Sequence, residues 1–158
     1  MKKYLEPTAT ESIFRFCISL SGLFVVVCLA SLGSAFLALF SLLLTLCLLW
    51  LFKRSLLLKN TGYPSSEVNY NNCKKAAVIY GWGIVSDIQM VRLEFETAAS
   101  LGSWGELITI MFTPSGIQIN SRPSPNKRPK LGGCSRIDQL NEKKVIDMLE
   151  SMPFAPET

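Results

Sequence analysis

The sequence predicts a two-helix transmembrane hairpin followed by a small cytoplasmic α+β domain with antiparallel strands and a C-terminal helix. Three observations lead to this fold class. The first is an uncharged run of 37 residues from Phe16 to Phe52. The second is a change, beyond residue 74, to the two-residue apolar alternation that is typical of strands with one buried face. The third is an amphipathic pattern over residues 135–152, which predicts a terminal helix.

The uncharged run is too long for one membrane-spanning helix. As a single helix it would extend about 55 Å, against a hydrocarbon core of about 30 Å. Its one candidate break is the sequence Ser-Leu-Gly-Ser at residues 31–34. The break leaves two spans that are each close to the roughly 20 residues one crossing needs. We therefore expect a transmembrane hairpin over residues 13–52, with its turn near residues 31–34.

The charges beside the two spans predict their orientation. Residues 1–59 carry six cations and two acids, whereas residues 60–158 carry ten of each, so the formal charge of +4 lies at the helix ends. The positive-inside rule then places both termini in the cytoplasm, with the chain in the inner (plasma) membrane and a cytoplasmic tail at residues 1–12. The flanking cations are Lys2, Lys3, Arg15, Lys53, Arg54 and Lys59.

A cleaved signal peptide is the competing interpretation of the N-terminal segment. Cleavage would fall near Gly33 or Ala35. However, two acidic residues, Glu6 and Glu11, lie in the region that should be positive, and a second apolar span follows at once. We therefore favour the hairpin.

Small residues recur along one face of the second span. Such residues let helix backbones approach closely, and their hydroxyl groups can bond across a helix interface. The face either packs on the first helix of the same hairpin, which we favour, or mediates homo-oligomerisation or docking to another membrane protein. Its members, at spacings of four, three and four residues, are Ser34, Ala38, Ser41 and Thr45.

Residues 53–73 are predicted to be a juxtamembrane linker, because their second part consists of turn formers and polar residues. The cytoplasmic domain is expected over residues 74–152. Within it, apolar residues alternate with charged ones over residues 91–96, which predicts a strand. A β-hairpin is predicted over residues 107–119, because Thr-Pro-Ser-Gly at residues 113–116 has the pattern of a tight turn.

The end of the domain is predicted to be a loop followed by the terminal helix. Residues 122–130 contain three prolines, which exclude a central strand or a helix. Residues 135–152 carry the helical apolar stripe, and Pro153 then ends the helix. The remaining residues, 153–158, form a C-terminal tail.

Two groups of residues are candidates for binding a protein partner or a lipid. The basic, proline-rich loop would attract anionic headgroups at about 1 kcal/mol per cation, or dock a protein as an extended strand, or be only a solvated loop. Two glycine-flanked tryptophans would rest on the membrane interface or pack in the core. The six candidates are Arg122, Lys127, Arg128, Lys130, Trp82 and Trp104. Four cations without interleaved aromatic residues are too weak a pattern to predict nucleic-acid binding.

The composition restricts catalysis and metal binding. The chain has no histidine, so it has no Ser–His or Cys–His pair and no His-ligated metal. Cys73 is followed by Lys74 and Lys75, and Cys134 lies near Arg136, an arrangement that favours a reactive thiolate. No partner motif accompanies either thiol, so we expect both to be inert or to be sites of palmitoylation, and not nucleophiles. We predict no catalytic residues, no metal ligands and no cofactor.

The layout of residues 13–152 resembles that of small bacterial membrane proteins with a PH-like cytosolic domain, most closely over residues 108–119. It is also similar in plan to the exclusion and immunity proteins of plasmids and other conjugative mobile elements. An anchored domain without a catalytic constellation predicts a non-enzymatic protein that recognises a protein partner. Exclusion of an incoming element is one such role, and an accessory subunit of a membrane complex is another. The alternative is a PH-like sensor of the anionic membrane surface.

Overall fold

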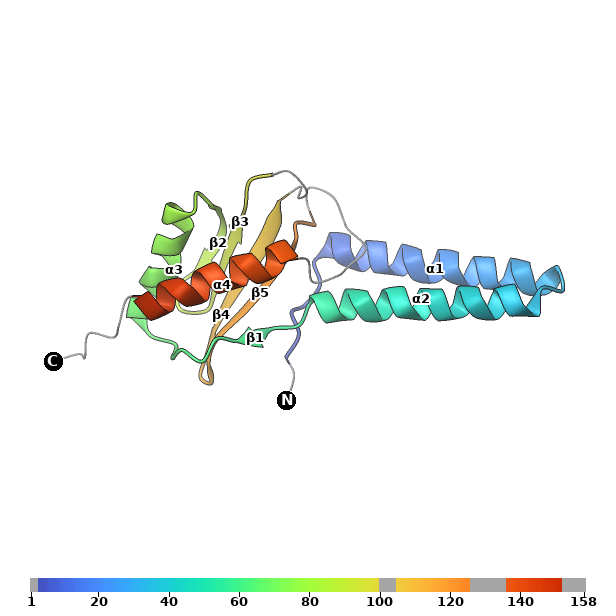
Figure 1. The fold of residues 1–158 in the computed structure, drawn as a ribbon, viewed down its shortest axis with the longest axis horizontal. Helices are drawn as coiled ribbons and strands as arrows, with labels where there is room; N and C mark the ends of the chain where they lie inside the picture. The colour runs from blue at the N-terminus through green and yellow to red at the C-terminus, as the bar shows by residue number, and fades with distance from the viewer. Residues whose placement is uncertain (1–2, 100–104, 126–135, 152–158) are drawn as a thin grey trace.

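A helical hairpin stands on one face of a five-stranded antiparallel sheet, and two further helices cover the other face (Figure 1). The computed structural model describes residues 3–99, 105–125 and 136–151. Within them the strand order in the sheet is β1-β5-β4-β3-β2. In chain order the elements are α1 (Ala9–Ser31), α2 (Ala35–Ser55), β1 (Lys59–Asn60), α3 (Glu67–Ile79), β2 (Gly83–Ile88), β3 (Arg92–Glu96), β4 (Glu106–Thr113), β5 (Gly116–Pro123) and α4 (Arg136–Ser151).

Helices α1 and α2 confirm the predicted pair of apolar N-terminal helices. With 23 and 21 residues, both are long and apolar enough to cross a bilayer. Between them, Gly33 adopts a φ of 74°, and the amides of Gly33 and Ser34 donate to carbonyls of the last turn of α1 at 3.0 and 3.1 Å. This is a Schellman motif, in which a left-handed residue ends the helix. The turn therefore lies within the predicted residues 31–34.

The small-residue face of α2 packs on α1. Ala38 is buried, and Ser34, Ser41 and Thr45 are partly buried, whereas the leucines and phenylalanines around them are exposed. Thr45 lies directly against Gly22, because a Cβ added to Gly22 would come within 2.5 Å of Thr45 Cγ2 and Oγ1. Packing within the hairpin thus accounts for this face. Homo-oligomerisation through it stays a prediction.

The predicted β-hairpin is present as β4 and β5. Thr113 pairs with Gly116, so that Pro114 and Ser115 form a two-residue loop. Gly116 has a φ of 108°, and a Cβ there would lie 2.8 Å from the carbonyl oxygen of Tyr63. Both its backbone conformation and its close neighbour therefore require glycine.

The predicted linker is wrong over residues 67–73, which begin helix α3. Ser66 caps this helix by accepting a hydrogen bond from the amide of Asn69 at 3.2 Å. The helix is polar overall, and its buried face mixes Tyr70, Cys73, Ala76 and Ala77 with the polar Asn69 and Asn72. So few apolar positions among asparagines and lysines resemble a loop. The structured domain consequently reaches further toward the N-terminus than residue 74.

The main core lies between α3, α4 and one face of the sheet. Helix α4 matches the predicted terminal helix, and its Val145 and Leu149 enter this core. Leu140 lies within the range of the apolar stripe predicted over residues 135–152 but is 51% exposed, and the inner positions of the first turns of α4 are polar. The buried residues of the core are Tyr70, Cys73, Ala77, Trp82, Leu93, Phe95, Ile108, Ile110, Phe112, Ile117, Ile119, Val145 and Leu149.

Substitution of Gly22 by alanine should destabilise the hairpin, because the new methyl group would overlap Thr45. Overpacking of this kind costs about 1–3 kcal/mol. The double variant Gly22→Ala, Thr45→Ala should recover part of this loss, since it removes the two overlapping atoms. Thermal unfolding of the full chain in mild detergent measures the effect. Ala30→Leu, at an exposed position of α1, is the control for added bulk. If the stability losses of Gly22→Ala and Thr45→Ala simply add in the double variant, the contact between these two residues would be contradicted.

Candidate functional site

Arg122, one of the predicted binding residues, does not lie on a surface loop. Strand β5 extends to Pro123, and Arg122 is only 2% exposed. The predicted loop over residues 122–130 is therefore wrong for its first two residues. The physical reason is that strand alternation continues past the apolar part of β5. Arg122 follows Gln118 and Asn120 on the face of the strand turned toward the hairpin.

Arg122 is the centre of a junction between the sheet and the helical hairpin. Its Nε donates to Glu11 Oε1 at 2.9 Å, and its Nη1 donates to Thr109 Oγ1 at 3.3 Å and to Asn120 Oδ1 at 3.2 Å. Glu11 lies in the first turn of α1 and is 7% exposed, so the ion pair is buried. Further hydrogen bonds are what allow a buried charge pair to be tolerated. The junction therefore fixes α1 to β5.

Asn120 fixes the end of α2 to the same face of the sheet. Its Nδ2 donates to the carbonyl oxygens of Ser55 at 2.8 Å and Leu57 at 2.9 Å. Carbonyls at a helix end have no partner within the helix, so Asn120 satisfies groups that would otherwise be unpaired. A small apolar cluster beside these bonds contains Leu5, Phe52 and Leu56, with Phe14, Leu58 and Met111 packed against it.

Four of the predicted binding residues, together with Cys134, fall outside the residues that the structure describes. Those four are Lys127, Arg128, Lys130 and Trp104. The hypothesis of an anionic-surface sensor therefore stays a prediction that depends on this part of the chain.

Trp82 belongs to the core. It is 8% exposed, and its ring lies 6.2 Å from Phe95 and 5.2 Å from Tyr80 between ring centroids. From α4, Lys144 Nζ lies 6.0 Å from the centroid of the same ring. Of the two predicted roles of Trp82, core packing is the one that its burial supports. A side chain this enclosed is not free to rest on a membrane surface.

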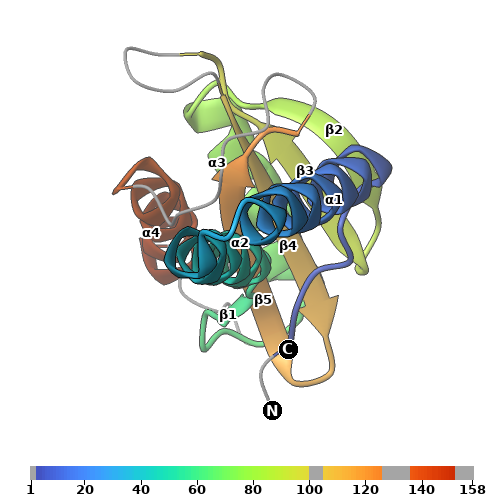
Figure 2. The same ribbon diagram turned by 90° about the vertical axis from the view of Figure 1, so that its right-hand side faces the viewer.

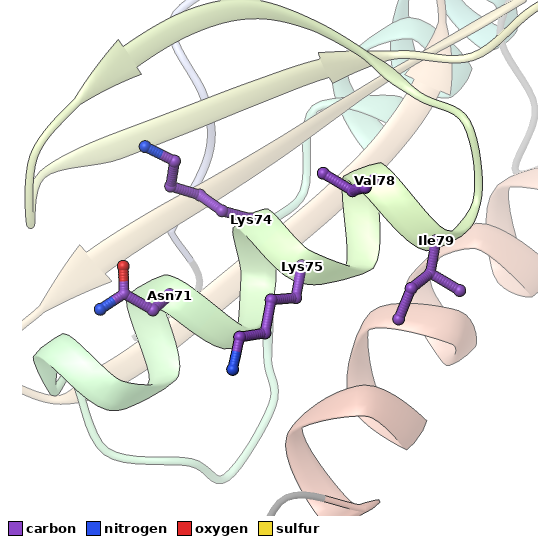
Figure 3. Close-up of a pocket in the computed structure, with 5 residues that line it drawn as sticks. All are labelled: Asn71, Lys74, Lys75, Val78 and Ile79. Carbon is purple, nitrogen blue, oxygen red and sulfur yellow. The ribbon is translucent and has the colours of Figure 1, made fainter.

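Sequence reasoning missed a groove on α3. It has a volume of about 500 Å³ and is lined by Asn71, Lys74, Lys75, Val78 and Ile79 (Figure 3). Val78 and Ile79 are 78% and 61% exposed. Lys74 and Val78 point toward the strands, whereas Lys75 and Ile79 point to the other side of the helix. Exposed aliphatic side chains with a polar rim are typical of interaction surfaces. The sequence signal was weak because α3 was not predicted as a helix, so its exposed face could not be recognised.

One side of this groove is held by an ion pair. Lys74 Nζ donates to Asp87 Oδ2 at 2.8 Å, and the Tyr70 hydroxyl donates to the other carboxylate oxygen. The hydrogen bond from Lys74, followed by that from Tyr70, lowers the pKa of Asp87. Lys75, in contrast, makes no ion pair with any residue of the described ranges. The groove therefore combines apolar surface with one uncompensated positive charge.

Cys73, on the same helix, faces the main core and is fully buried. Desolvation raises the pKa of its thiol to about 12, so the thiol is neutral despite the neighbouring lysines. Over residues 3–99, 105–125 and 136–151, no group of three or more His, Cys, Asp or Glu side chains is placed to hold a metal ion.

Comparison of the chain with protein-family models, with curated proteins and with solved structures gives no match. The junction and the α3 groove are therefore the features on which a functional proposal depends.

Arg122→Met should destabilise the folded chain strongly, because it leaves the Glu11 carboxylate buried without its partner. Removal of one member of a buried ion pair costs about 3–5 kcal/mol. Arg92→Met is the matched control, since the Arg92–Glu94 pair is more exposed and should contribute less than about 1 kcal/mol. Urea unfolding of the full chain in detergent measures both. A loss no larger for Arg122→Met than for Arg92→Met would contradict a structural role for the junction.

The buried Cys73 thiol should make folding less favourable at high pH. Its pKa rises from about 9 when unfolded to about 12 when folded, so its stabilising contribution is complete below pH 9 and is lost as the pH rises toward 12. The difference in stability between the natural chain and Cys73→Ala, followed from pH 8 to pH 11, isolates this contribution. Alkylation mapped by mass spectrometry should leave Cys73 unmodified in the folded chain at pH 8. Rapid modification there would contradict the burial.

Proposed function

We propose that this chain is a non-enzymatic membrane protein whose cytoplasmic domain recognises a protein partner through the α3 groove. In this proposal, α1 and α2 form a hairpin in the inner (plasma) membrane, with both termini in the cytoplasm. Such a protein would act in the exclusion of a mobile element or as an accessory subunit of a membrane complex. Both roles stay predictions from the layout.

The surface of the hairpin supports membrane insertion. Large apolar side chains are exposed all along α1 and α2, which would be unfavourable in water over so wide an area. Cations lie only near the end of the hairpin that joins the domain, as the positive-inside rule requires. There, Arg54 lies 5.4 Å from the ring centroid of Trp50, an arrangement suited to the interfacial region. Glu11 lies one helical turn before Arg15, so the junction would hold the sheet at the membrane surface.

The α3 groove is the observation that supports partner recognition. Its two aliphatic residues are among the most exposed of the domain, and they lie beside the uncompensated ammonium of Lys75. Apolar contact would supply affinity, and Lys75 would favour a partner surface that carries an acidic group. The groove lies on the sheet face opposite the hairpin, and would therefore be accessible from the cytoplasm (Figure 1).

A groove variant should lose its partner while it keeps its fold. We expect Lys75→Glu combined with Ile79→Ser to reduce co-purification of the partner from mild detergent by about tenfold or more, as substitutions at the centre of an interface do. Lys143→Glu, at an exposed position of α4, is the charge-matched control. Equal thermal stability of the natural chain, the groove variant and the Lys143→Glu control would establish that folding is unaffected. Recovery of only lipids and copies of the same chain, or an unchanged yield with the groove variant, would contradict the proposal.

A further inference from the structure

The sheet has one long open edge, formed by β2. Among the described residues, strand β2 pairs only with β3 and ends the strand order, whereas the opposite edge is the two-residue β1. On β2, Ile84, Val85 and Ile88 are each about half exposed, at 53%, 49% and 52%. Open edges are commonly protected by charged residues or by extreme shortness. The edge at β1 is protected by its length and by Lys59, whereas β2 is six residues long, its one charge, Asp87, is paired with Lys74, and it has a bulge between Ile84 and Ser86.

The charges on and beside β2 are paired. On β2, Asp87 is paired with Lys74 at 2.8 Å, and on the neighbouring β3, Arg92 is paired with Glu94 at 2.6 Å. A charged patch would repel an identical copy of itself, because a two-fold interface brings the same residues together. A neutral apolar edge has no such repulsion. The edge is therefore compatible with a second copy of this chain.

The orientation of the sheet relative to the hairpin adds a geometric argument, which rests on the proposed membrane insertion. Figure 1 shows the hairpin projecting from one side of the sheet, and Figure 2, viewed along the hairpin, shows the strands broadside behind it. Two copies in one membrane have the same orientation, so a symmetric pair is related by an axis along the membrane normal. That axis is roughly perpendicular to the sheet. A two-fold rotation about it sets two β2 edges antiparallel, with both hairpins on the same side.

We propose that β2 is a homodimer interface, in which the β2 edges of two copies meet in an antiparallel arrangement within one membrane. A register shift between Ile84 and Ser86 marks a β-bulge in the strand. Because a bulge interrupts regular backbone pairing, the apolar side chains of Ile84, Val85 and Ile88 supply most of the contact. The interface is separate from the residues of the α3 groove that the partner experiment changes.

Photo-crosslinking of two differently tagged full-length copies, produced together in one membrane, tests this interface. With benzoylphenylalanine in place of Val85, irradiation should give a product that carries both tags. The same amino acid in place of Lys143 is the control and should give about tenfold less of that product. Ile88→Lys and, independently, Ile84→Lys should each lower the yield from position 85 by about tenfold, since each places like charges across the two-fold axis. Because both side chains are half exposed, thermal stability should be unchanged.

The proposal is overturned when the folded protein gives no product carrying both tags, gives equal amounts from positions 85 and 143, or crosslinks at position 85 only to other proteins or to lipid. The groove variant Lys75→Glu, Ile79→Ser separates this proposal from the previous one. It should leave the dual-tag product unchanged while it loses the partner. A dual-tag product without any co-purified partner would support the homodimer and contradict partner recognition. A co-purified partner without any dual-tag product would support partner recognition and contradict the homodimer.

Discussion

The buried ion pair between Arg122 and Glu11 is the constraint on which the arrangement of the molecule depends. It joins the first turn of α1 to β5 across a sequence separation of 111 residues, with bonds of ordinary length and two further acceptors for the guanidinium group. Asn120, a neighbour on the same strand face, holds the end of α2. Both helices of the hairpin are therefore attached to one strand.

This attachment explains why the sheet has two faces of different chemistry. The face that carries Ile117 and Ile119 forms the main core with α3 and α4. The other face carries Gln118, Asn120 and Arg122, and it receives helix ends whose backbone groups need hydrogen-bonding partners. An apolar second face would leave those groups unsatisfied, which is costly when they are removed from water. Polar residues in the middle of a sheet are thus a requirement of the junction.

The sequence was most informative where one local rule decided the structure. An uncharged run with one candidate break, at residues 31–34, predicted the hairpin, and Thr-Pro-Ser-Gly at residues 113–116 predicted the turn between β4 and β5. It was least informative where long-range contacts decided. Arg122 beside Pro123 suggests a loop until Glu11 is known to lie opposite. The α3 helix and its groove were missed because a helix rich in asparagine and lysine, with two asparagines among its six buried residues, resembles a linker. Residues 126–135, which hold most of the predicted basic loop, are not among those described.

The turn between α1 and α2 has a consequence for how such a hairpin would be assembled. The three residues between the two helices carry no charge, and the amides of all three donate to carbonyls of α1. For a hairpin inserted as proposed, this short segment is the part of the hairpin that would have to reach the far side of the bilayer. Because its amides are already bonded, little water would need to accompany it. The two helices could therefore partition together as one preformed unit, without translocation of a hydrophilic loop.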